Sequence, residues 1–233
     1  MSSKGKTWTP SIIALLSRPV GASRSEFNAR LVAEASRRVA DEPTLVGANV
    51  FVIDDDLEKL AAATAGPGGA TFDAMVAISG YDQGAAHAVL ADALGHETCH
   101  AYRVETRPIK TCSRTWAVGE RTPGLVMVSP VYRADHLSAR EFDEYWRDGH
   151  APLALRHHVG MWDYKQNPVR EVLTDGSPPY DGIALLGFPS IDAFTGGLFD
   201  SPEGTEIIMT DTKRFLALDR SQSTLMAEFR LRG

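Results

Sequence analysis

The stretch FDAMVAI at Phe72–Ile78 decides the fold, because it recurs as YDGIALL at Tyr180–Leu186, 108 residues further along the chain. Each copy sets an aromatic residue and an aspartate ahead of a short apolar run. Such a run is typical of a buried strand. The recurrence indicates that the two halves of the chain contain the same structural unit.

Two shorter matches flank this pair and keep its order. The triplet REF at 140–142 matches SEF at 25–27 on a predicted helix, and Thr224–Ala227 matches Thr98–Ala101 on a predicted strand. The offset changes from one match to the next, which places insertions between the shared elements. Three ordered matches on equivalent elements predict an internal duplication.

Each copy runs strand, helix, strand, strand, helix, strand, and the first copy adds a short helix at 54–64 between its second and third strands. Hydrophobic periodicity in the first copy predicts strands at 11–16, 44–53, 72–78 and 98–105, and helices at 23–40, 54–64 and 85–94. A βαββαβ unit is ferredoxin-like, with an antiparallel sheet that carries both helices on one face. We therefore expect an α+β fold with two tandem ferredoxin-like halves, residues 1–110 and 111–233, whose sheets cover each other around a barrel-like interior.

Composition excludes several classes of protein. The hydrophobic content of 43% suits a globular protein, and the net charge of −6 comes without a basic run that could follow a nucleic acid or an anionic membrane. No apolar run approaches the roughly 20 residues that cross a bilayer, and the first ten residues lack the apolar centre of a secretory signal. We expect a cytoplasmic protein with no nucleic-acid or membrane partner, in which Cys99 and Cys112 are reduced thiols.

The second half contains a motif that the first half lacks, FDEYWRDGHAPL at Phe142–Leu153. An aromatic residue stands three positions before a Tyr-Trp pair, a histidine four positions after the tryptophan, and Tyr164 and Gln166 follow as Tyr-x-Gln. This pattern resembles the EthD family of dimeric α+β-barrel proteins. The resemblance implies that the two halves form a pseudo-dimer of this barrel within one chain.

Helical spacing places Phe142, Trp146 and His150 on one stripe that faces the sheet. Gly149 and Pro152 are poor helix formers, so the helix should kink or end beside His150. Histidine is the side chain with an unperturbed pKa near neutrality. We therefore expect His150 to be the general acid or base of a site at this point.

Strand alternation places Trp162, Tyr164 and Gln166 on one face of the next strand, toward His150. Tyr164 would orient or polarise a substrate, and Trp162 and Gln166 would contact it. The other residues expected to wall this pocket are Phe142, Tyr145 and Trp146. The aromatic lining favours a small hydrophobic or aromatic substrate.

The resemblance implies cofactor-independent dehydration, decarboxylation or cyclisation of an aromatic or polyketide-like compound, that is, a lyase-type enzyme without a cofactor. Two alternatives stay open: a non-catalytic accessory protein that holds a hydrophobic metabolite, and a barrel-type monooxygenase with a haem or quinol-like substrate. A purely structural His150 is a third. The duplication argues against it, because Leu31 and Ala35 occupy the positions that correspond to Trp146 and His150.

Metal sites are disfavoured. His96-Glu97-Thr98-Cys99-His100 satisfies the H-E-x-x-H signature of zinc proteases, but that signature requires a helix, and the duplication places these residues on a strand. At most one of the neighbouring pair His157 and His158 can face the pocket. We expect no metal. A barrel closed within one chain leaves two assembly states open, a monomer or a homodimer.

Overall fold

The computed structural model describes residues 9–64, 72–80, 90 and 99–233. The first half contains β1 (Thr9–Leu16), α1 (Arg24–Asp41), β2 (Leu45–Val52), α2 (Glu58–Thr64), β3 (Ala74–Gly80) and β4 (Cys99–Lys110). The second half contains β5 (Leu125–Val131), α4 (Ala139–Tyr145), the π-helix η1 (Trp146–His150), α5 (Ala151–His157), β6 (Asp163–Val172), β7 (Gly182–Phe188), α6 (Ile191–Gly197), α7 (Pro202–Phe215) and β8 (Thr224–Arg232). Apart from Leu90, the predicted helix at 85–94 lies outside the described residues.

The eight strands form one closed barrel in the order β1-β3-β2-β8-β5-β7-β6-β4, with every neighbouring pair antiparallel. Around the ring, β4-β1-β3-β2 is followed by β8-β5-β7-β6, so the same strand order occurs twice. The two sheets join where β2 meets β8 and where β4 meets β6. The predicted fold class, two tandem ferredoxin-like halves around a barrel, is confirmed.

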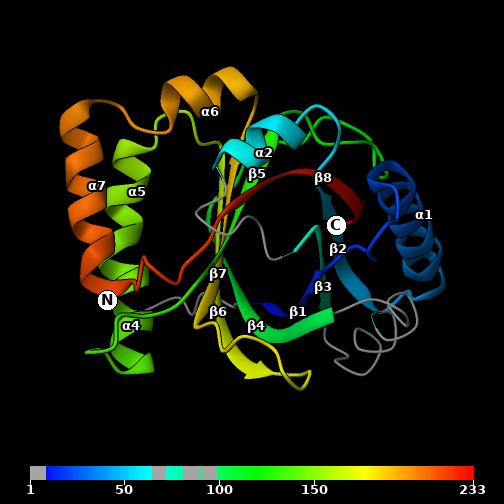
Figure 1. Cartoon of the computed structure of the whole chain (residues 1–233), viewed down its shortest axis with the longest axis horizontal. Coiled ribbons are helices and arrows are strands. Elements are labelled where there is room, and N and C mark those ends of the chain that lie inside the picture. The colour runs from blue at the N-terminus through cyan, green and yellow to red at the C-terminus, as the bar shows by residue number, and fades with distance from the viewer. Residues whose placement is uncertain (1–8, 65–71, 81–89, 91–98) are drawn as a thin grey trace, which may run out of the picture.

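The helices form two layers on opposite sides of the barrel, with α1 on one side and α4, α5 and α7 on the other (Figure 1). Helix α1 begins after Ser23, which caps it, and packs Phe27, Leu31, Ala35 and Val39 on its sheet. None of the helices within the described ranges is long and apolar enough to span a membrane.

Strand alternation divides the residues of the second sheet between the barrel interior and the helices. On β6, Asp163 and Lys165 face the interior, whereas Tyr164 faces the helices. Tyr164 pairs with Leu186 on β7, and Leu186 pairs in turn with Met127 on β5, so the three residues form one row across the sheet. This row is part of the floor of a cavity under the helices.

Candidate active site

A cavity of about 390 Å³ lies between the outer face of the second sheet and the helices η1 and α7. The sheet supplies Met127, Ser129, Ala184 and Leu186, and the helical side supplies Trp146, His150, Ile208 and Phe215. Thr64 of α2 also lines it, so the first half contributes to a cavity that belongs mainly to the second. The volume falls within the usual range of small-molecule sites, about 300–1,000 Å³.

The π-helix η1 positions two of the cavity residues. Gly149 and Pro152 predicted a kink or an end beside His150; the helix does not end there but continues through one widened turn, in which the Ala151 N–H donates to the Trp146 carbonyl. Proline has no N–H for the regular bond to the fourth preceding residue, so an irregular turn costs little there. Such π turns inside α-helices occur often at functional sites.

His150 is held by a carboxylate from another helix. Its Nδ1 lies 2.7 Å from Asp211 Oδ2 of α7, and Tyr145 Oη donates to Asp211 Oδ1 at 2.6 Å. Burial alone would raise the pKa of Asp211, but the hydrogen bonds from His150 and Tyr145 hold that pKa below its usual value. An ionised Asp211 can only accept, so Nδ1 of His150 carries the proton and Nε2 is the basic nitrogen.

His158 is the second imidazole of the cavity. Its Nδ1 donates to the Leu198 carbonyl, and burial lowers the pKa of the ring. A neutral ring with Nδ1 protonated again leaves Nε2 as an acceptor. His157, its neighbour, bonds Asp200 instead, with Nδ1 3.0 Å from Oδ2. The expectation that at most one of the pair faces the pocket agrees with this arrangement.

Tyr164 has a phenolic oxygen that already accepts two hydrogen bonds. Trp146 Nε1 donates to it at 3.2 Å and Gln166 Nε2 at 3.1 Å. Burial raises the pKa of Tyr164 to about 12, so the phenol is neutral. Its hydroxyl hydrogen has no acceptor among the described residues, and the ring lines the cavity. Tyr164 can therefore donate to an oxygen atom of a bound molecule.

The other predicted pocket residues support the cavity from outside. Phe142 packs behind Trp146 and Phe215, with ring centroids 5.4 and 6.0 Å apart. Tyr145 holds Asp211, and Gln166 is fully buried, where its Nε2 also donates to the Trp146 carbonyl at 2.7 Å. They fix the positions of the residues that line the cavity.

Trp162 lies elsewhere. Strand β6 begins only at Asp163, so the alternation that we applied to Trp162 does not reach it. Its N–H donates to the Gly187 carbonyl at 3.0 Å, and its ring stacks on Trp116 with centroids 5.5 Å apart. It lines a small pocket in the barrel interior and does not adjoin Tyr164.

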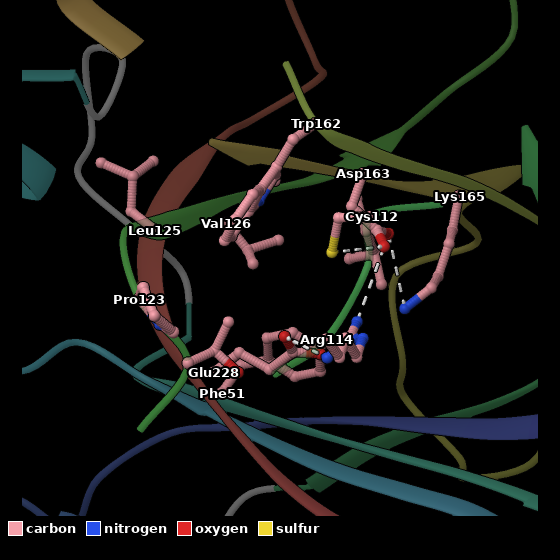
Figure 2. A pocket seen from close by; sticks show the side chains of 13 residues that line it. Phe51, Cys112, Arg114, Pro123, Leu125, Val126, Trp162, Asp163, Lys165 and Glu228 are labelled. Atoms are coloured by element: carbon pink, nitrogen blue, oxygen red, sulfur yellow. Dashed lines mark hydrogen bonds and ion pairs between the residues drawn. The ribbon is translucent and has the colours of Figure 1, made fainter. Parts of the chain in front are cut away.

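That interior pocket holds a charged cluster (Figure 2). Arg114 Nη1 lies 3.1 Å from Glu228 Oε2, and its Nη2 lies 3.6 Å from Asp163 Oδ2. Lys165 Nζ is 3.6 Å from Asp163 Oδ1, and the Cys112 thiol donates to Asp163. Two cations balance two carboxylates in a free volume of about 10 Å³, room for about one water molecule. This cluster therefore joins strands, and the pocket around it is too small for a substrate.

Asp211 is the functional residue that our sequence reasoning missed. On α7 it shares one face with Gly204, Ile208 and Phe215, all buried. An aspartate on the apolar face of an amphipathic helix needs a buried partner, and this signal was present in the sequence. The sequence could not identify the partner, because His150 lies 61 positions away.

Among the described residues, no set of side chains suits a metal ion or haem. Among the described residues no three His, Cys, Asp or Glu side chains gather as metal ligands. Of the H-E-x-x-H match, His100 lies on strand β4 and bonds Ser177, while His96 falls outside the described residues. His150 or His158 could offer a nitrogen to haem iron, but no Lys or Arg of the described chain lines the cavity to pair with the two haem propionates. The residues therefore do not fit haem.

Solved structures with this fold match nearly the whole chain. A structure described as an anthrone oxidase-like protein matches with a TM-score of 0.62 and 11% identity, over 97% of this chain and 94% of that one. A presumed monooxygenase from Fusobacterium nucleatum matches with a TM-score of 0.52 and 9% identity, over 96% of this chain and 93% of that one. A mutant chlorite dismutase from Candidatus Nitrospira defluvii matches with a TM-score of 0.52 and 12% identity, over 94% of this chain and 91% of that one. At such identities the matches establish the fold. No curated protein sequence matches the chain.

The expectation of a cofactor-independent lyase is wrong. The matching structures are described as an oxidase-like protein, a monooxygenase and chlorite dismutases, which point to oxidative chemistry and agree better with the monooxygenase alternative.

The family resemblance is confirmed by a direct match. Residues 134–219 match the family model described as the EthD domain. This segment includes η1, both cavity histidines, Tyr164 and Asp211. The match to the EthD domain therefore covers the part of the second half that carries these cavity residues.

Proposed function

We propose that this protein is a monooxygenase that oxidises a small aromatic ketone or phenol with molecular oxygen in the cavity under η1 and α7. The observation that carries the proposal is the convergence of three groups on one cavity. They are a base at His150 that a carboxylate supports, a neutral hydrogen-bond donor at Tyr164, and a wall of apolar and aromatic side chains. Solved structures of the same fold that are described as oxidase-like or as a monooxygenase support the choice of reaction.

The first step uses Tyr164 and His150 together. The Tyr164 hydroxyl donates to the carbonyl oxygen of the substrate and favours its enolate, while His150 Nε2 takes a proton from the acidic carbon of the substrate. The Asp211 carboxylate stabilises the imidazolium that forms. Such a positioned base contributes about 10²–10⁴-fold to a rate.

Oxygen then reacts with the electron-rich carbon of the enolate. The enolate supplies the electrons, a C–O bond forms, and the proton on His150 returns to give a hydroperoxide. Removal of the second proton from the same carbon breaks the O–O bond. One oxygen atom remains as a new carbonyl, and the other leaves as water. A methylene group thus becomes a ketone, and both electrons and atoms balance.

Anthrone is a suitable probe, because it carries a carbonyl and an acidic methylene on three fused rings. Full-length protein and anthrone are mixed in air in an oxygen electrode, and the uncatalysed oxidation is subtracted. We expect one O2 consumed for each molecule of product. The rate with His150→Gln should fall by about 100-fold or more.

His136→Gln is the matched control, since His136 is an exposed histidine of the same half and does not line the cavity. It should keep the full rate. Equal oxygen consumption by the wild type and His150→Gln would refute the role of His150. Tight binding of anthrone without any oxygen consumption would instead favour the accessory-protein alternative.

A further inference from the structure

The cavity has a second polar group far from His150. Ser129 of β5 and Ser223, just before β8, both line it, and their hydroxyl oxygens lie 2.7 Å apart. Two hydroxyls that bond each other use one hydrogen, so one hydrogen of the pair has no acceptor among the described residues. Half-buried hydroxyls in this state favour an oxygen atom on a ligand.

The other lining hydroxyls of this region are already occupied by the backbone. Ser221 Oγ donates to the Ala217 carbonyl at 2.9 Å and accepts from the Tyr132 N–H, and Thr212 Oγ1 donates to the Met209 carbonyl. The Ser129–Ser223 pair differs from them because its hydroxyls bond only each other within the described chain.

Sheet register places the pair at the opposite edge of the cavity floor from Tyr164. Ser129 pairs with Ala184, and Ala184 pairs with Gln166, the same-face neighbour of Tyr164 on β6. β5 and β6 flank β7, so the two polar ends lie two strand spacings apart, about 10 Å. The floor between them is formed by Met127, Ala184 and Leu186, which offer no hydrogen bonds from their side chains.

We propose that the substrate is an elongated, fused-ring aromatic compound with oxygen functions at both ends, and that the Ser129–Ser223 pair binds the oxygen remote from the reaction. The inference rests on the proposed function for the identity of the reacting end. The apolar floor and the aromatic walls contact the ring system of the substrate. Tyr164 donates a hydrogen bond to the reacting carbonyl, and the serine pair binds a hydroxyl on the terminal ring. The serine pair thus determines specificity and has no part in the bond changes.

The test compares anthrone with the same compound hydroxylated at ring position 2. Binding to the full-length protein is measured under nitrogen by quenching of tryptophan fluorescence, so no reaction takes place. We expect the wild type to bind the hydroxylated compound about five- to tenfold more tightly, the effect of about one net hydrogen bond. Ser129→Ala with Ser223→Ala should bring this ratio to about one and leave the affinity for anthrone unchanged.

Thr212→Val is the control, since it removes a hydroxyl from the same wall that its own helix already satisfies. It should keep the wild-type ratio, and urea unfolding of each variant confirms that it is folded. An unchanged ratio in the double serine variant, or no preference in the wild type, would overturn the inference alone. If neither compound binds to the wild type, both the inference and the proposed function are refuted.

Discussion

Gly182 and Trp146 differ as a pair from their counterparts in the first half, Ala74 and Leu31. A Cβ atom added at Gly182 would lie 2.4 Å from Cζ3 of Trp146, well inside van der Waals contact. The indole therefore packs directly on the backbone of β7. A tryptophan at this point of the fold requires a glycine beneath it, and the sequence of the second half supplies both.

Gly182→Ala tests this coupling. The new methyl group cannot fit without movement of Trp146, so we expect a loss of about 1–3 kcal/mol in the free energy of unfolding and a shift in tryptophan emission. Gly196→Ala is the matched control, because a Cβ there meets nothing within 4 Å and lies on helix α6. Gly196→Ala should raise the free energy of unfolding slightly, because alanine favours the helix more than glycine does. Equal effects of the two changes in urea unfolding would refute the close contact.

The buried His158 ring should make the stability of the protein depend on pH. Burial lowers its pKa in the folded protein below the ordinary value of 6.5, so the unfolded chain binds more protons between these two values. Stability from the neutral ring is present above about pH 6.5 and is lost as the pH falls toward the folded pKa. His158→Gln should reduce the slope of unfolding free energy against pH between about 5 and 7, measured in urea. His136→Gln should leave it unchanged, and equal slopes for both variants would contradict the assignment.

At the scale of elements, the helix that carries Trp146 and His150 is fixed at its start. Ser138 caps α4 with a full capping box, in which Ser138 Oγ accepts from the Glu141 N–H and Glu141 Oε2 accepts from the Ser138 N–H. The equivalent Ser23 of α1 makes one long cap bond, 3.5 Å from the Glu26 N–H. The two halves therefore offer a comparison of a strong and a weak cap.

Ser138→Ala should cost about 1 kcal/mol of unfolding free energy, and Ser23→Ala clearly less, because the Ser138 hydroxyl accepts a shorter cap bond, 3.2 Å against 3.5 Å, and also donates to Glu141 Oε2. Urea unfolding of both variants measures the difference. A larger loss from Ser23→Ala would show that the cap geometry does not control the stability of these helices.

The local sequence pattern allowed some side-chain positions to be predicted from the sequence and left others out of reach. Alternation placed Tyr164 on the helical face of β6, because that rule holds inside a strand. It misplaced Trp162, one residue before the strand begins. The contact between His150 and Asp211 joins two helices far apart in sequence, and no local rule gives such a pairing.

At the scale of the whole molecule, the duplication predicted the barrel correctly, since two sheets that each carry helices on one face must cover the other face. What the pattern could not give is the charged cluster inside the barrel. Arg114, in the segment between β4 and β5, bridges Glu228 on β8 and Asp163 on β6 within the barrel. The boundary between the halves near residue 110 remains our proposal.

Arg114→Met should strongly destabilise the barrel, because it leaves the buried Glu228 carboxylate without its cation and Asp163 with Lys165 alone. We expect a loss of about 3–5 kcal/mol in urea unfolding. The control is Arg103→Met, whose partner Glu171 is exposed, and which should cost less than about 1 kcal/mol. Similar losses for both variants would mean that the interior cluster does not join the strands.

The central claim is that molecular oxygen supplies an atom to the product in the cavity at His150. The most direct measurement is mass spectrometry of the product formed from anthrone under ¹⁸O2 in unlabelled water, with the uncatalysed reaction subtracted. The account predicts one labelled oxygen atom in each product molecule, and loss of this enzymatic product in His150→Gln. Product that carries no label, or that forms at the same rate under nitrogen, would contradict it.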